Sequence, residues 1–316
     1  MSGTALVTGG AGFIGSHIAE AYIADGWSVT CLDDLSRGKR EQVPATAKFV
    51  EADVRSKDAF AAIADGKFDV VVHQAAQIDV RVSVDEPAHD ASINLVGFAN
   101  VLGAVAAGKV RRVVFASSGG VVYGDPSVLP TPEPTANLPI SPYGVSKLAG
   151  EHYLRVLGEL HGFEGVALRY SNVYGPRQDP ASEAGVVSIF VSRLLANKPL
   201  TVFGDGTQTR DYVFVRDVAR ANLLAGSVNV SRGERLDVPA FNIGTGSETT
   251  VNELAQHVGR AVDRTPVIEY APPRPGELFR SCLDVSKAAR ELKWTPQVSF
   301  GEGMKALAAW FEGTKH

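Results

Sequence analysis

The chain lacks the features that would suit it to a membrane, a disulfide framework or a nucleic acid. Its only two cysteines, Cys31 and Cys282, match neither zinc-ligand spacing nor a disulfide pattern. No apolar run approaches the roughly 20 residues of a membrane-spanning helix. The first residues lack the basic start and apolar core of a signal peptide. The net charge of −4 comes without a long basic run, so neither nucleic acid nor membrane is expected as a partner. These absences predict a protein of the reducing cytoplasm.

Two kinds of catalytic centre are also missing. The seven histidines are scattered without ligand spacing, which predicts no metal site. The sequence contains no G-x-S-x-G elbow, which argues against a serine hydrolase.

The first 170 residues alternate short apolar runs with longer helical stretches. The expected strands are 4–8, 28–32, 48–51, 70–73, 113–116 and 165–169, and the expected helices are 14–25, 57–63, 88–107 and 143–161. Runs that are apolar throughout are typical of parallel strands buried on both faces. The pattern predicts an α/β fold with a Rossmann-type, doubly wound parallel sheet. Beyond residue 172, frequent Pro and Gly and shorter elements predict a smaller, mixed α/β C-terminal lobe.

A glycine-rich turn follows the first expected strand and opens the first helix. Gly9, Gly12 and Gly15 have the spacing G-x-x-G-x-x-G, which allows the backbone to approach a pyrophosphate at a helix N-terminus. Asp33 closes the second strand, where an acid binds the adenosine ribose hydroxyls and repels a 2′-phosphate. The pattern predicts a dinucleotide site that favours NAD over NADP.

Two charged residues leave details of this site open. Arg37 lies near Asp33 and could still receive a phosphate. Asp53 and Val54, just past the third strand, fit either the edge of an adenine or an ordinary solvated turn.

Tyr143 and Lys147 form a Y-x-x-x-K pair downstream of a strand that ends in Ser117 and Ser118. Helical i, i+4 spacing places both side chains on one face. A tyrosine pKa of about 10 must fall by about 3 units, or about 4 kcal/mol, for base chemistry at neutral pH. A cation about 4 Å away supplies roughly that energy at an effective dielectric near 20. The pair therefore predicts a proton-transfer site.

Six motifs occur in an order that resembles the extended short-chain dehydrogenase/reductase family, whose members modify nucleotide sugars. They are residues 9–15, 73–76, 115–124, 141–147, 169–177 and 210–212, and the resemblance runs from residue 4 to about residue 295. Within this NAD-dependent epimerase/dehydratase group, the chain is most similar to the UDP-glucose (UDP-galactose) 4-epimerases. Residues 172–180 and 185–187 particularly support that choice.

The resemblance implies roles for individual residues. Tyr143 is expected to take the proton of the sugar O4, Lys147 to hold the nicotinamide ribose, and Ser118 to hydrogen-bond O4. Counting from the strand favours Ser118, counting back from Tyr123 gives Gly119, and Ser117 is the alternative hydroxyl.

The remaining implied contacts divide between cofactor and substrate. NAD is expected to contact Gly9, Gly12, Phe13, Ile14, Gly15, Asp33, Asp34, Asp53, Val54, Gln74, Ala75, Ala76, Asn94, Ser117, Tyr143, Lys147, Tyr170 and Val173. The UDP-sugar is expected to contact Ser118, Asn172, Val187, Arg210, Arg274, Glu277 and Ser281. Arg210 and Arg274 suit the diphosphate, because guanidinium groups form bidentate, charge-assisted bonds. Glu277 suits the uridine ribose.

The expected division assigns residues 1–172 and about 213–245 to an NAD-binding Rossmann domain. Residues of about 173–212 and 246–316 then form the nucleotide-sugar-binding lobe. The Ala- and Leu-rich helices 88–107 and 143–158 could pair in a homodimer, and burial inside the monomer explains them equally well.

The reaction is predicted by what surrounds the catalytic hydroxyl. The family's 4,6-dehydratases carry an Asp-Glu pair where this chain has Gly119 and Gly120, and its decarboxylases carry an acid nearby. Epimerisation at C4 of a UDP-hexose, through a transient 4-keto sugar, is the activity expected. Ser281 stands where some epimerases have a bulky Tyr, so UDP-GlcNAc and UDP-GalNAc are further candidate substrates.

Two alternatives remain at this point. A UDP-glucuronate 4-epimerase would need a cation in the sugar site. Arg81 and Arg193 are candidates, but the sequence places neither of them there. A non-catalytic NAD-binding sensor would usually have lost the Tyr or the Lys, and both are present.

Overall fold

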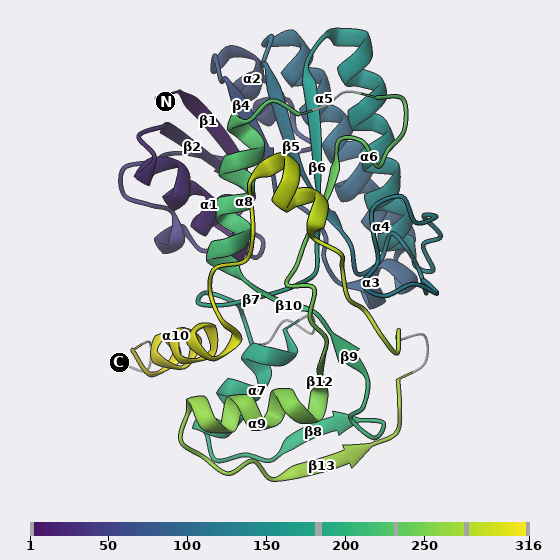
Figure 1. The fold of residues 1–316 in the computed structure, drawn as a ribbon. Coiled ribbons are helices and arrows are strands. Elements are labelled where there is room, and N and C mark those ends of the chain that lie inside the picture. Colours follow the sequence, from purple (N-terminus) through teal and green to yellow (C-terminus); the bar gives the residue numbers. More distant parts are fainter. Residues whose placement is uncertain (1–2, 181–184, 231–232, 275–277, 314–316) are drawn as a thin grey trace.

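One parallel sheet forms the centre of the computed structural model, which describes residues 3–180, 185–230, 233–274 and 278–313 (Figure 1). Its seven strands lie in the order β11-β6-β5-β4-β1-β2-β3 and all pair in parallel. They are β1 (Thr4–Thr8), β2 (Ser28–Asp33), β3 (Lys48–Glu51), β4 (Val70–His73), β5 (Arg112–Ser118), β6 (Glu164–Tyr170) and β11 (Ala240–Ile243). The order reverses between β1 and β4, as in a doubly wound sheet, so the predicted fold class is confirmed.

Helices cover both faces of this sheet because its strands are apolar on both faces. On β1, Ala5 and Val7 pack into the cluster that includes α1 (Phe13–Ala24) and α8 (Val215–Ser227). Leu6 points the other way, into the cluster of α2 (Lys57–Asp65), α5 (Phe98–Ala107) and α6 (Pro142–His161). This alternation with period two is the geometric property of a strand. Because the seven strands run parallel, their carboxyl ends lie at one edge of the sheet.

The helix expected over 88–107 is confirmed as one helical run, Pro87–Ala107, whose middle is π-helical. The segment forms α4 (Pro87–Ala91), a π-helical stretch η2 (Ser92–Gly97) and α5, and a short helix α3 (Val80–Asp85) precedes it. Within η2, the Asn94 side chain bonds the backbone of Gln77 at both its N–H and its carbonyl, at 3.0 Å each. π-Helical turns of this kind occur frequently at functional sites.

The run Pro87–Ala107 is also, within the described ranges, the one helix long and apolar enough to cross a membrane. In this fold it lies against α2 and α6 instead.

A smaller lobe lies beyond the strand ends and has its own core (Figure 1). Two short parallel strands, β7 (Asn172–Tyr174) and β10 (Tyr212–Phe214), connect it to the sheet. The lobe contains α7 (Val186–Leu195), β8 (Leu200–Phe203), β9 (Thr209–Arg210), β12 (Thr249–Thr250), α9 (Val251–Ala261), β13 (Ile268–Ala271) and α10 (Phe300–Gly313). β8 pairs with β13 in parallel, and β9 pairs with β12 antiparallel.

Part of the C-terminal region packs against the sheet side instead of the small lobe. Ala288 and Leu292 of the π-helical stretch η3 (Ala288–Leu292) are fully buried in the cluster around α8. Trp294 is fully buried there too, and its Nε1 donates to the carbonyl of Asp217 at 2.9 Å. We therefore propose that the two-part division holds with residues 285–294 added to the Rossmann side.

Candidate active site

In the glycine-rich turn, backbone atoms lie so close to Gly9 and Gly15 that neither position has room for a side chain. Gly9 has a φ of 65°, and a Cβ on it would lie 2.8 Å from the backbone N of Ala75. A Cβ on Gly15 would lie 2.0 Å from the carbonyl oxygen of Gly9. Gly12 is the N-cap of α1, whose first turn, with Phe13 and Ile14, follows directly. The bare backbone at a helix N-terminus is a site for a phosphate anion, so these residues fit a dinucleotide.

Asp33 ends β2 beside this turn and is held by its backbone. Its Oδ2 accepts from the N–H of Ala11 at 3.0 Å and its Oδ1 from the N–H of Leu35 at 2.9 Å. Burial raises the pKa of this carboxyl above its usual value, an effect that the two backbone bonds oppose. The side chain is placed at the carboxyl end of its strand, where a ribose would bind. The neighbouring Asp34 is used locally, accepting from the N–H of Ser36 at 3.0 Å.

Asp53 forms an ion pair within its own turn. Arg55 Nε lies 2.9 Å from Oδ1 of Asp53, and this guanidinium lowers the pKa of the carboxyl. The turn interpretation is thereby favoured for Asp53, while Val54 is buried in the core with its carbonyl bonded to Asn100 at 2.8 Å.

The other residues expected around a cofactor gather at the ends of β4 and β6. Gln74 Nε2 donates to the hydroxyl of Tyr170 at 3.1 Å, and Tyr170 also bonds Asn222. Ala75 is the residue beneath Gly9. Ala76 comes next along the chain, and Val173 lies in the middle of β7. That these residues contact NAD stays a prediction.

Tyr143 and Lys147 stand at the start of α6, which is anchored tightly on β5. Ser141 caps the helix by accepting from the N–H of Gly144 at 3.1 Å. A Cβ on Gly150 would lie 2.6 Å from the Phe115 ring, so the helix approaches the strand closely. Lys147 is buried, and its Nζ donates to the carbonyl of Ala116 at 3.0 Å. Its Nζ also lies 5.7 Å from the centre of the Tyr143 ring, on the same face of the helix.

The electrostatics of this pair differ from the simple expectation. Burial raises the pKa of Tyr143 well above its usual value, and the charge of Asp90 adds to the effect. Burial lowers the pKa of Lys147 to about 8. The expected lowering of the tyrosine pKa by Lys147 therefore stays a prediction for the site with its ligands bound.

The two serines at the end of β5 have different surroundings. The Ser117 hydroxyl is buried and donates to Oε1 of Glu151 at 2.5 Å. Glu151 in turn pairs with Arg169, whose Nη2 lies 2.7 Å from Oε2. Ser118 is the last residue of the strand and only half-buried. Its availability supports Ser118 over Ser117 as the reactive hydroxyl, and Gly119 has no side chain to offer.

A Cβ on Gly119 would lie 2.5 Å from the Leu283 side chain, whereas one on Gly120 would meet nothing closer than 3.9 Å. Leu283 thus occupies the space that an acidic side chain at position 119 would need.

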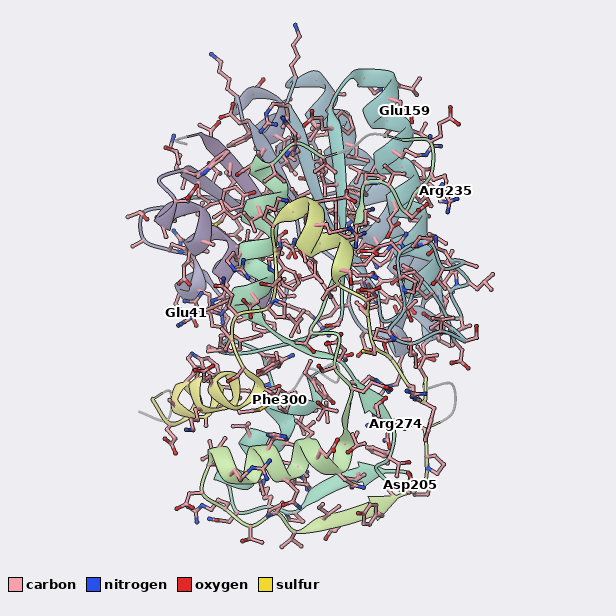
Figure 2. All side chains as sticks on the ribbon, viewed as in Figure 1. Glu41, Glu159, Asp205, Arg235, Arg274 and Phe300 are labelled. Atoms are coloured by element: carbon pink, nitrogen blue, oxygen red, sulfur yellow. The ribbon has the colours of Figure 1, made fainter. Side chains whose placement is uncertain are left out.

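A cavity of about 760 Å³ lies in the small lobe and is lined by Arg274, one of the two expected diphosphate cations. The Arg274 guanidinium stacks 3.8 Å above the ring of Phe203, which lines the cavity. Arg210 on β9 reaches the carbonyl of Phe279, on the same wall, at 3.5 Å. Figure 2 shows Arg274 and Asp205 on one side of the lobe, away from Phe300 at the start of α10. A volume of this size suits a small-molecule ligand.

Apart from Arg274, the residues that line this cavity were missed from the sequence, among them Phe203, Gln208, Tyr270 and Phe279. They come from three separate segments, and no local spacing relates them. For Phe203, the turn 203–206 at the end of an apolar run is the one sequence feature that could have indicated a place beside a cavity.

The remaining substrate candidates lie on separate segments of the chain. Asn172 begins β7, and its N–H donates to the carbonyl of Asp211 at 2.9 Å. Ser281 is buried, and Val187 of α7 lies in the lobe's core. Glu277 lies outside the described residues.

The two arginines considered for a sugar carboxylate lie on different elements. Arg193 Nε donates to the carbonyl of Pro199 at 2.6 Å, and Arg81 is an exposed residue of α3. Throughout the described ranges, no three His, Cys, Asp or Glu side chains are grouped to hold a metal ion.

Comparison with known proteins adds independent findings. The model of the NAD dependent epimerase/dehydratase family matches residues 5–244. A UDP-glucose 4-epimerase of Mycolicibacterium smegmatis is 44% identical over 311 residues, 97% of each chain. The structure of a UDP-glucose 4-epimerase with UDP-glucose from Thermotoga maritima has a TM-score of 0.93 at 43% identity, covering 99% of this chain and 100% of that one. A Thermus thermophilus UDP-glucose 4-epimerase in complex with NAD has a TM-score of 0.92 at 43% identity, covering 98% and 99%.

Proposed function

The chain belongs to the NAD-dependent epimerase/dehydratase family, and we propose that it is an NAD-dependent UDP-sugar 4-epimerase that interconverts UDP-glucose and UDP-galactose. The observation that carries the proposal is the placement of Ser118, Tyr143 and Lys147 at one edge of the sheet, next to the glycine-rich turn. This edge, at the carboxyl ends of the strands, is where ligands bind in doubly wound folds.

When bound, NAD supplies the hydride acceptor for C4 of the sugar and returns the hydride afterwards. Gly9, Gly12 and Gly15 would hold its pyrophosphate and Asp33 its adenosine ribose, because the turn is shaped for close approach. Lys147, fixed by the carbonyl of Ala116, would orient the nicotinamide ribose.

The chain's own residues handle the proton and the orientation of the sugar. Tyr143 takes the proton from O4 as the 4-keto sugar forms, and gives it back after the sugar has turned over. Ser118 hydrogen-bonds O4 throughout. General acid–base catalysis of this kind contributes about 10²–10⁴-fold to the rate.

Epimerisation is favoured over elimination because no acidic side chain follows Ser118. Gly119 and Gly120 carry no acidic side chain, and the Leu283 side chain lies next to Gly119. The keto sugar therefore has no neighbouring acid or base from position 119 to direct it into another reaction.

The test is NMR of the purified protein with UDP-galactose, UDP-GalNAc or UDP-glucuronate, first without added NAD and then with it. The expected result is the C4 epimer of UDP-galactose without any added reductant, and no epimer with Tyr143→Phe. Absence of conversion of all three sugars, with the protein folded and NAD bound, would contradict the proposal.

The small side chain of Ser281 supports a finer proposal on the substrate. We propose that the site accepts an N-acetyl group at C2, so that UDP-GalNAc is also converted. Ser281→Tyr is expected to lower turnover of UDP-GalNAc at least tenfold more than that of UDP-galactose. Equal effects on both sugars would show that residue 281 does not face C2.

An apolar strip on α6 and η2 supports a homodimer. Leu160, Val96, Val145 and Tyr153 are 71%, 60%, 52% and 48% exposed, and Val156 lies between Tyr153 and Leu160 on α6. Burying such a strip against its copy would remove apolar surface from water. Sedimentation of wild type should give a dimer and Leu160→Glu a monomer, with Val267→Glu on the small lobe as the matched control. A monomeric wild type would exclude the dimer.

A cytoplasmic location fits the two cysteines, since Cys31 and Cys282 are both free and buried.

A further inference from the structure

A buried carboxylate stands behind the catalytic pair. Asp90 of α4 has no exposed surface and accepts three hydrogen bonds. Gln77 Nε2 and Asn94 Nδ2 each reach its Oδ1 at 2.9 Å, and Ser146 Oγ reaches its Oδ2 at 2.6 Å. The two amide nitrogens can only donate, so these partners match an ionised carboxylate.

Ser146 makes this carboxylate part of the catalytic turn. It lies between Tyr143 and Lys147 in the sequence of α6 and is itself buried. Because a serine hydroxyl in a helix interior ordinarily bonds its own backbone or solvent, a buried bond to another helix fixes the relative position of the two. Asp90 thereby holds α4 to the turn of α6 that carries both reactive side chains.

Asn94 and Gln77 extend the junction to two more segments. The Asn94 side chain bonds both the N–H and the carbonyl of Gln77 at 3.0 Å, and Gln77 Nε2 also donates to the carbonyl of Asp79 at 2.9 Å. Four pieces of chain meet at Asp90: the loop after β4, α4, η2 and α6. Asn94 follows Asp90 by four residues in the same helical run, a spacing that places the two side chains on one face.

The charge of Asp90 acts on both reactive groups. It raises the pKa of Tyr143 in the same direction as burial does, and it raises the pKa of Lys147 against burial. His73 on β4 is a further titratable group near Lys147. The other ionisable residues on or beside α3 and α4 are half-buried or exposed: Asp79, Arg81, Asp85, Glu86 and His89. On α6 they are Glu151, which is buried and paired with Arg169 of β6, and the half-buried or exposed His152, Tyr153, Arg155, Glu159 and His161.

Resting on the epimerase function proposed above, we propose that Asp90 is a positioning residue of this site. Through Ser146 it fixes the turn of α6 that carries Tyr143 and Lys147, and its negative charge faces that turn. It does not touch the substrate and acts through its neighbours alone.

Two variants separate the hydrogen bond from the charge. Asp90→Asn keeps the shape and removes the charge, whereas Ser146→Ala keeps the charge and removes the bond. Asp90→Asn should move both limbs of the pH profile of kcat to lower pH by about one unit, because both groups lose a nearby negative charge. Ser146→Ala should lower kcat about tenfold and leave both limbs in place. Unmoved limbs in Asp90→Asn, or an unchanged kcat in Ser146→Ala, would overturn the proposal.

A second measurement needs no turnover. Protein labelled with ¹³C at the lysine Cε is titrated by NMR, and the Lys147 signal is the one missing from Lys147→Met. The midpoint is expected near pH 8 in wild type, about one unit lower in Asp90→Asn, and unchanged in Ser146→Ala. An unmoved midpoint in Asp90→Asn would overturn the role of the charge.

The two measurements also keep the two proposals apart. If the wild type converts no UDP-sugar, the proposed function fails, while the titration still decides the role of Asp90. If Asp90→Asn does not fold, the kcat of Ser146→Ala still decides the positioning role.

Discussion

The side chains at the strand ends of the sheet are buried, whereas those around the cavity of the small lobe are exposed. Lys147 and Arg169 at the sheet are 4% and 0% exposed, and each has its hydrogen bonds within the protein. Tyr270 and Phe279 at the cavity are both 60% exposed, and the space between such residues measures about 760 Å³. The sheet therefore fixes the chemistry before any ligand arrives, while the lobe offers surface that a ligand must cover.

Because of this difference, we expect substitutions in the two regions to change different kinetic constants. Groups preorganised for the transition state act on kcat, whereas groups that grip a distant part of the substrate act on KM. Substitutions at the sheet should lower turnover or stability, and substitutions at the cavity should weaken binding.

The largest effect is expected from Tyr143→Phe, which removes only the hydroxyl. Turnover of UDP-galactose should fall by about 10²–10⁴-fold with little change in KM, because acid–base catalysis is lost while packing stays. A coupled assay measures the rate, and circular dichroism confirms the fold. A fall confined to KM would place Tyr143 on the binding side and break the comparison.

Arg169→Met should cost stability instead of chemistry. Removing one partner of the fully buried Arg169–Glu151 pair leaves a charge without compensation, at about 3–5 kcal/mol of unfolding free energy. Urea denaturation measures this loss. The double variant with Glu151→Leu should recover much of it, and an equal loss in the double variant would mean that the charge is not the cause.

The sheet could be predicted from sequence because its signal is local. Strands β1, β3 and β4 have the predicted bounds, since each contains a short apolar run within its own segment. The π-helical stretch η2 inside the helix 87–107 could not be predicted in this way. Its Asn94 bonds Gln77, 17 residues earlier, and no pattern within the helix indicates that contact.

The same contrast holds for the site. The glycine turn and the Tyr143–Lys147 pair are spacings within one segment, so the sequence indicates them directly. The walls of the cavity come from separate segments around Phe203, Tyr270 and Phe279, which only the fold brings together. The rise in the Tyr143 pKa was also out of reach, because burial is a property of packing and not of spacing.

Arg274→Ala tests the cavity side with a smaller effect. Loss of a cation from the expected diphosphate site should raise KM about tenfold or more, equivalent to about 1.5–3 kcal/mol, and leave kcat within twofold. Steady-state kinetics with UDP-galactose measures both constants. Arg264→Ala, an exposed arginine after α9, is the matched control and should change neither. A selective loss of kcat in Arg274→Ala would mean that the lobe takes part in the chemistry.

The smallest effect concerns the pH dependence of stability, and it tests whether the sheet side is as dry as its geometry indicates. Burial lowers the pKa of Lys147 from 10.5 to about 8. Between these values the unfolded chain binds more protons than the folded one, so the unfolding free energy rises with pH and is lost again as pH falls through 8. The gain is at most about 1 kcal/mol per pH unit.

Urea denaturation from pH 7 to pH 10 should show this slope in wild type and not in Lys147→Met. Other titrating groups are common to both proteins and cancel in the difference. Parallel curves would mean that water reaches Lys147 freely, so that the two regions differ in shape but not in solvation. A steeper wild-type curve above pH 8 would show that Lys147 is kept out of water by the same packing that orients it.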